Sequence, residues 1–157
     1  MTLILGTENC RLDSNGRFKL PIALKNQLQQ GDCRFVIRPS IYAECLELWT
    51  YSSFEQEIEK LQGQLNPYSI EDRKLLRKMT AGNIIELDNS DRLVIPMEQK
   101  RLLGDTKDIV LQAMGSCIEV WSSSKYQALD SEAIDYAEKA NQRLGSLPAD
   151  LKNRSDE

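Results

Sequence analysis

The sequence LDSNGRFKLP (residues 12–21) recurs as LDNSDRLVIP (residues 87–96), 75 residues further along the chain. The likeness continues downstream in matched pairs: FVIRP (35–39) with IVLQA (109–113), and CLELWTYSSF (45–54) with CIEVWSSSKY (117–126). Self-similarity of this kind indicates that the chain contains two copies of one structural unit.

Each unit contains four short apolar runs that predict strands, because turn residues bound them and they are rich in Val, Ile, Leu, Phe and Trp. The runs lie at 3–5, 18–20, 33–37 and 45–51 in the first unit and at 84–87, 93–95, 109–111 and 117–121 in the second. Pro21 and Pro96 each open a short helix, since proline suits the first helical position. Each unit therefore has the order strand, strand, short helix, strand, strand.

The remaining segments complete the predicted domain organisation. It consists of a first repeat over residues 7–53, a helical connector over 54–80, a second repeat over 81–124, C-terminal helices over 125–144 and a disordered tail over 145–157. The connector and the C-terminal helices carry apolar residues at helical spacing, whereas the tail is polar and has no periodicity.

Four short strands are too few to bury both faces of a sheet, so the two units should pack together. We expect an α+β fold in which the tandem β-β-α-β-β repeats form one pseudo-twofold barrel of swapped hairpins with the helices outside. Such a barrel would leave no open sheet edge.

The composition excludes several classes of active site. The chain of 157 residues has 20 basic and 24 acidic side chains, a net charge of −4 and no histidine. Without an imidazole, Ser/His/Asp and Cys/His nucleophilic sites, histidine-containing zinc sites and histidine general bases are all excluded. No Gly-rich phosphate loop or metal-ligand spacing is present. We therefore expect no enzyme activity, no cofactor, no metal and no small-molecule substrate.

The amino-terminal sequence MTLILGTENC has neither a basic stretch nor a long apolar run, so we expect a cytoplasmic chain with no signal peptide and no membrane association. The four cysteines form no C-x-x-C pair, and we expect them to be reduced, small buried hydrophobes. The first 40 residues carry six basic and three acidic groups, so the rest of the chain has a net charge of −7. This asymmetry permits a local polyanion-binding face, although an ordinary scatter of solvated charges is the simpler explanation.

The turn Asp13-Ser14-Asn15-Gly16-Arg17 joins two predicted strands, and its residue order favours a type I turn followed by Gly16 in the left-handed region. In this three-residue loop Asp13 lies opposite Arg17 and can pair with it. A two-residue loop on Asn15-Gly16 is the competing form, and it would place Ser14 opposite Arg17.

The second copy keeps the spacing between Asp88 and Arg92 but has Asp91 in place of the glycine. Aspartate tolerates the left-handed conformation better than most residues. We also expect Asp91 to place a negative charge beside Arg92, which would weaken any binding of anions by Arg92.

Two interpretations of these Asp and Arg pairs stay open on spacing alone. Each pair can be a surface salt bridge worth less than about 1 kcal/mol. Alternatively, a rigid hairpin holds the Arg17 guanidinium so that it can donate two hydrogen bonds, to guanine O6 and N7.

The two D-x-x-x-R motifs, each followed by a proline and later by an E-[LV]-W strand, resemble the MraZ family of bacterial transcriptional regulators. The likeness covers both repeats and implies AbrB-like swapped-hairpin units. It implies a cytoplasmic, nucleoid-associated repressor that assembles into homo-oligomeric rings. Such a repressor binds double-stranded DNA at repeated G-rich boxes upstream of the division and cell-wall gene cluster.

The resemblance also implies the site residues. Arg17 takes the role of the main DNA-contacting residue, and Arg92 is its counterpart in the second motif. Asn15 can donate hydrogen bonds to DNA from the turn, and by position Lys19 beside the turn and Arg11 before it are candidate phosphate contacts. Asp13, Gly16 and Asp88 take the role of positioning the turns. Asn15 stands where many members of the family have lysine, so this chain lacks one phosphate-neutralising charge. The alternative function is a protein-interaction barrel with no specific DNA binding, which the negative net charge favours.

Overall fold

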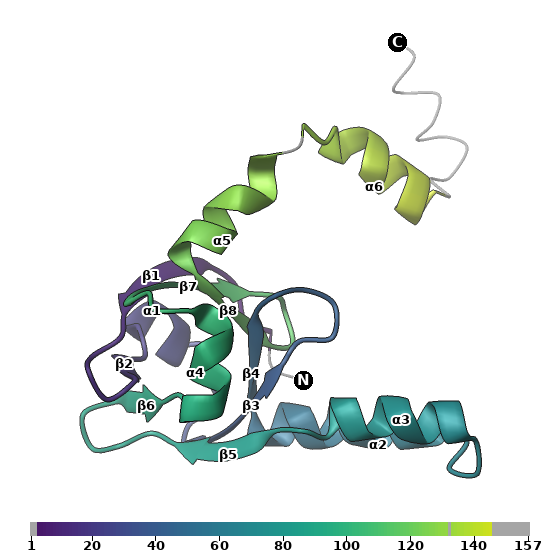
Figure 1. The fold of residues 1–157 in the computed structure, drawn as a ribbon, viewed down its shortest axis with the longest axis horizontal. Helices are drawn as coiled ribbons and strands as arrows, with labels where there is room; N and C mark the ends of the chain where they lie inside the picture. Colours follow the sequence, from purple (N-terminus) through teal and green to yellow (C-terminus); the bar gives the residue numbers. More distant parts are fainter. Residues whose placement is uncertain (1–2, 132, 146–157) are drawn as a thin grey trace. The chain divides into compact units, whose positions relative to one another are not determined.

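The two repeats interleave their strands in a mixed α+β fold (Figure 1). A computed structural model describes residues 3–131 and 133–145. The elements in chain order are β1 (Thr7–Arg11), β2 (Arg17–Lys19), α1 (Ile22–Lys25), β3 (Arg34–Pro39), β4 (Leu46–Thr50), α2 (Tyr51–Gln64), α3 (Ile70–Met79), β5 (Asn83–Glu86), β6 (Arg92–Val94), α4 (Met97–Leu103), β7 (Asp108–Ala113), β8 (Ile118–Ser122), α5 (Ser123–Ala128), a 3-10 turn (Leu129–Ser131) and α6 (Tyr136–Leu144).

Six antiparallel strands pair in the order β1-β7-β8-β4-β3-β5, and β2 pairs with β6 as a separate ribbon. The order is symmetric between the repeats, because β1 and β5, β7 and β3, and β8 and β4 occupy equivalent places. A pseudo-twofold axis therefore passes between β4 and β8, where Glu47 lies opposite Glu119. β1 of the first repeat pairs with β7 of the second, and β5 of the second pairs with β3 of the first. Each repeat thus supplies an edge strand to the other.

The predicted closed barrel is wrong in one respect, because the sheet stays open. Over residues 3–131 and 133–145 no pairing joins β1 to β5, and the β2–β6 ribbon is not bonded into the six-stranded sheet. β2 and β6 have three residues each and pair with one another, so they are too short to link the two edges as well.

The first predicted strand, at residues 3–5, is also wrong. Ile4 forms only an isolated bridge to Gly115, and the strand follows at Thr7–Arg11. Its sequence TENCR is polar because β1 is an edge strand, so an apolar run does not mark it. The predicted tail, residues 145–157, lies outside the described residues apart from Gly145.

One hydrophobic core lies between the inner face of the sheet and the ribbon. The ribbon contributes Phe18 and Leu93, which are 1% and 0% exposed. The sheet contributes Phe35, Ile37, Leu46, Leu48, Ile109, Leu111, Ile118 and Val120. Since full burial of one such side chain is worth about 1.5–3 kcal/mol, these contacts hold the ribbon firmly against the sheet.

Two helices pack on the outer face of the sheet, as predicted. Trp49 of β4 contacts Phe54 of α2 edge to face at 6.0 Å, and Trp121 of β8 contacts Tyr126 of α5 in the same way at 6.4 Å. Cysteine burial is as expected for Cys45 and Cys117 and wrong for Cys33, which is exposed. Among the described residues, no helix is both long and apolar enough to cross a bilayer.

The chain divides into a unit that ends at Tyr126 and a smaller one that begins at Gln127. In the smaller unit, Asp135 caps α6 by accepting a hydrogen bond from the Glu138 backbone N–H at 3.2 Å. Both hairpin loops belong to the larger unit.

Candidate nucleic-acid interface

The first hairpin has the three-residue loop that the sequence predicts. The backbone N–H of Asp13 donates to the Arg17 carbonyl at 2.8 Å, and the N–H of Gly16 donates to the Asp13 carbonyl at 3.1 Å. Gly16 has a φ of +77°, in the left-handed region. The competing two-residue loop is therefore not formed, and Asp13 lies opposite Arg17.

The carboxylate of Asp13 fixes this loop through the backbone. Its Oδ1 accepts hydrogen bonds from the N–H groups of Asn15 and Arg17, each at 2.9 Å. The bond from the Arg17 N–H is the main reason why the pKa of Asp13 is lowered from its ordinary value. The predicted Asp13–Arg17 side-chain pair is not formed within the described part of the chain, since the carboxylate binds the backbone of Arg17 instead of its guanidinium.

The second hairpin repeats the backbone pattern. Asp88 Oδ1 accepts from the N–H groups of Ser90 at 2.8 Å and Arg92 at 2.9 Å, and the Arg92 N–H bond is the largest cause of the lowered pKa of Asp88. Asp91 takes the place of Gly16, with a φ of +60°. Here the side chains do pair, because Arg92 Nε donates to Asp88 Oδ2 at 2.9 Å.

Asp91 does not act on Arg92 in the way that we expected. Its carboxylate forms an ion pair at 2.7 Å with Lys25 of α1, in the other repeat. Arg92 is instead restrained by Asp88. The guanidinium of Arg92 is therefore less available than that of Arg17, but the residue responsible is Asp88.

The β2–β6 ribbon brings the predicted cations together on its outer face. Arg17 and Lys19 flank the buried Phe18, so both side chains lie on the exposed side of β2. The register places Arg92 opposite Lys19 and Val94 opposite Arg17. The two loops lie on the same side of the molecule, on the left in Figure 1.

This arrangement suits recognition of a polyanion with bases exposed in a groove. Asn15 and Arg17 are exposed, and the described residues contain no carboxylate paired with Arg17. A planar guanidinium on a rigid backbone can donate two parallel hydrogen bonds to a guanine edge. In the described residues, no group of three His, Cys, Asp or Glu side chains converges to hold a metal ion.

A sequence profile of the family described as "MraZ protein, putative antitoxin-like" matches the chain twice, at residues 3–78 and 79–147. The chain belongs to the MraZ family. The two matches also confirm that the sequence contains two copies of one unit.

Curated relatives in the MraZ family match over nearly the full length. A protein from Flavobacterium psychrophilum is 35% identical over 96% of this chain and 97% of its own. Proteins from Christiangramia forsetii and Cytophaga hutchinsonii are 33% and 32% identical, over 93% and 92% of this chain and 96% of their own lengths. All three are named transcriptional regulator MraZ.

Two lysines beside the MraZ motifs, Lys25 and Lys100, were not predicted from the sequence. Lys25 holds Asp91, while the aliphatic stem of Lys100 lies 3.5 Å from where a Cβ on Gly16 would stand. The internal repeat could have revealed them, because the two lysines are 75 residues apart and occupy the same place in α1 and α4. Arg11 Nε lies 4.0 Å from Asp108 Oδ1 across β1 and β7.

Proposed function

We propose that this chain is a sequence-specific DNA-binding transcriptional repressor. It acts on repeated G-rich boxes upstream of the division and cell-wall gene cluster, in the cytoplasm and at the nucleoid. The observation that carries the proposal is the exposed Arg17 guanidinium on a hairpin whose backbone Asp13 fixes through two hydrogen bonds. The names of the curated relatives support a role in transcription.

Arg17 reads guanine in this proposal, and its neighbours position the duplex. Asn15 and Lys19 contact the sugar-phosphate backbone, which orients a protein on DNA without specifying sequence. Arg92 has a smaller role, because Asp88 already accepts a hydrogen bond from its Nε. Gly16 and the two aspartates position the turns.

A homo-oligomeric ring would raise the affinity of such a small contact surface. Several hairpins on one assembly meet repeated boxes at a high effective concentration, so that modest contacts add up to strong binding. Boxes spaced by about one helical turn, roughly 10 base pairs, would face the same side of the duplex.

A second candidate is a protein-interaction module without specific DNA binding. A groove of about 400 Å³ beside α2 supports it, since Phe54 and Ile58 line it together with Ile84, which is 60% exposed. The net charge of −4 favours this candidate as well.

Fluorescence anisotropy with duplexes that carry repeated G-rich boxes, beside mixed-sequence duplexes of equal length, separates the two. We expect tight, salt-sensitive binding to the boxes, and a loss of about 5- to 150-fold in Arg17→Ala, which corresponds to one bidentate base contact. Arg77→Ala, on α3, removes the same charge elsewhere and should bind normally. Equal, weak binding to every duplex, or an unaffected Arg17→Ala, would favour the protein-interaction module.

A reporter gene placed behind the boxes tests the repressor role. Expression should fall when the wild-type chain is present and recover with Arg17→Ala. Activation by the wild-type chain would contradict repression while leaving DNA binding intact.

A further inference from the structure

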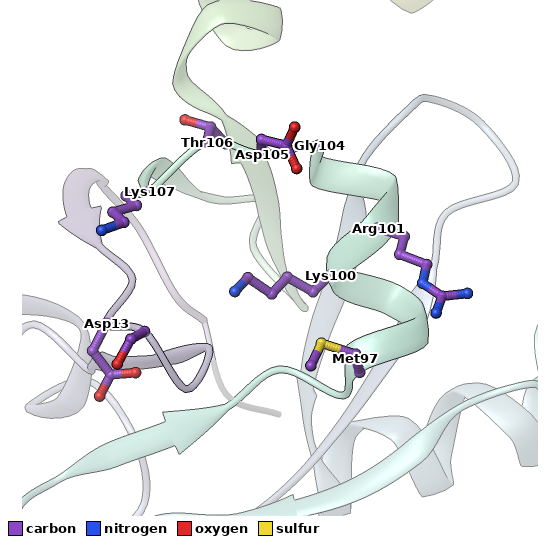
Figure 2. A pocket seen from close by; sticks show the side chains of 9 residues that line it. Asp13, Met97, Lys100, Arg101, Gly104, Asp105, Thr106 and Lys107 are labelled. Atoms are coloured by element: carbon purple, nitrogen blue, oxygen red, sulfur yellow. The ribbon is translucent and has the colours of Figure 1, made fainter.

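A cleft of about 480 Å³ lies between the first hairpin loop and α4, and the proposed function does not use it. Asp13 and Ser14 line one side, and Met97 and Lys100 of α4 line the other, while Lys107 lies near Asp13. Figure 2 shows the Lys100 side chain extending from α4 toward the loop that holds Asp13, whereas Arg101 points away. The cleft is therefore built from both repeats, with the loop from the first and the lysines from the second.

Both lysines are held in place beside the loop. The stem of Lys100 passes close to Gly16, with its Cδ at 3.5 Å from where a Cβ on that glycine would stand. The Lys107 carbonyl accepts a hydrogen bond from the Leu12 N–H at 2.7 Å, which ties Lys107 to the residue before the loop. Among the described residues, neither ammonium group forms an ion pair.

The pseudo-symmetry-related position beside the second loop has a more negative charge. There Lys25 replaces Lys100 and is neutralised by Asp91 at 2.7 Å. Cys33 replaces Lys107, since its carbonyl accepts the corresponding hydrogen bond from Leu87 N–H at 2.9 Å. Apart from Arg101, which points away, the charged residues that line the first cleft are Lys100, Lys107, Asp13 and Asp105, and their charges sum to zero. Its counterpart has a net charge of −2, from Lys25, Asp32, Asp88 and Asp91.

We infer that the first cleft binds a backbone phosphate of the same DNA duplex that Arg17 reads, with Lys100 and Lys107 as the phosphate contacts. This inference rests on the proposed function. Arg17 ends the loop that forms one wall of the cleft, so a duplex seated on Arg17 brings its sugar-phosphate strand to these lysines. Asp91 neutralises the lysine that would otherwise perform the same role beside the second loop.

The salt dependence of DNA binding tests the inference, because each neutralised phosphate adds about 0.9 to the slope of log affinity against log salt. We would compare Lys100→Met and Lys107→Met with wild type on G-box and mixed-sequence duplexes. Methionine keeps the unbranched stem that passes Gly16. Each variant should lower the slope by about 0.9 per contacting subunit on both duplexes. When the salt concentration rises from 50 to 200 mM, the affinity of each variant should then fall by a factor about three times smaller than the factor for wild type.

Lys25→Met is the matched control, since it removes the same charge from the related position, where Asp91 already neutralises it. It should keep the wild-type slope, whereas Asp91→Gly, which frees Lys25, should steepen it. Thermal melting of each variant checks that the fold is intact.

The possible outcomes separate the two proposals. If Arg17→Ala abolishes box binding but the Lys100 and Lys107 variants keep the wild-type slope, the cleft is not a phosphate site and the proposed function stands. A loss of slope in Lys25→Met equal to that in Lys100→Met would overturn the inference as a general charge effect. If wild type does not prefer the boxes but the two cleft variants still lower the slope, the sequence-specific function fails and the phosphate site stands.

Discussion

Replacing Arg38 by methionine should destabilise the chain more than a typical substitution, because this arginine is buried and ties three elements together. Its side chain is 3% exposed, and its Nε donates to Glu47 Oε1 at 3.0 Å between β3 and β4. It also donates to the Met79 carbonyl at the end of α3. The guanidinium lies 5.3 Å from the Trp49 ring and 5.1 Å from the Phe54 ring.

The size of the effect follows from the carboxylate that remains. Glu47 is 6% exposed and faces Glu119 directly across β4 and β8, so Arg38→Met leaves a buried negative charge opposite another one. Removing one partner of a buried ion pair costs about 3–5 kcal/mol. For a unit of this size that lowers the melting temperature by roughly 10–15 °C.

Urea unfolding followed by circular dichroism measures this cost directly. The double variant Arg38→Met/Glu47→Leu should recover most of the loss, since no unpaired charge is then buried. Glu119→Gln is the control, and it should change the free energy of unfolding by less than about 1 kcal/mol, in the stabilising direction, because it removes the like charge opposite Glu47. A loss below about 1 kcal/mol in Arg38→Met would refute the argument that the ion pair is effectively buried.

Three further outcomes can be measured on the same purified chain. Gly16→Ala should cost about 1–2 kcal/mol in urea unfolding, because alanine at a φ of +77° is strained and its Cβ would lie 3.3 Å from the Ile95 carbonyl oxygen. The pKa of Asp13 and of Asp88 is lower in the folded state, so both carboxylates stabilise the fold above about pH 4, and this contribution is lost as the pH falls through the folded pKa values. In the double variant Asp13→Asn/Asp88→Asn, the free energy of unfolding should therefore change less with pH in this acidic range. Iodoacetamide at pH 8 should modify exposed Cys33 first, since burial raises the pKa of Cys45 to about 12. Mass spectrometry of the native chain measures the two modifications, and equal modification of both cysteines would contradict this expectation.

Local features of the hairpins were predictable from the sequence, because they depend on residues close together in the chain. Gly16 in the left-handed region, with an aspartate three residues earlier, is enough to favour the three-residue loop over the two-residue one. The side-chain partner of Asp13 was not predictable in the same way. Its carboxylate can reach either the Arg17 guanidinium or the backbone N–H groups of the turn, and the sequence does not rank the two.

Features that depend on contacts between residues far apart in the chain could not be predicted from the sequence. β1 has the polar sequence TENCR, and its partner β7 lies about 100 residues away, so neither composition nor periodicity marks it as a strand. The ion pair between Lys25 and Asp91 spans 66 residues and exists only because α1 of one repeat packs beside the loop of the other. Whether the sheet closes likewise depends on which edges meet, which no single repeat encodes.

The interleaving of the repeats explains how two nearly identical hairpins can differ in function. Each loop packs against the short helix of the other repeat. The residue at position 16 or 91 therefore determines whether the lysine on that helix has a carboxylate to pair with. The glycine at position 16 offers no carboxylate to Lys100, which forms no ion pair within the described residues, whereas the aspartate at position 91 pairs with Lys25. In the second hairpin Asp91 thus pairs with Lys25 and Asp88 pairs with Arg92, whereas among the described residues neither Lys100 nor Arg17 forms an ion pair. Both hairpins keep the backbone hydrogen bonds that the fold requires.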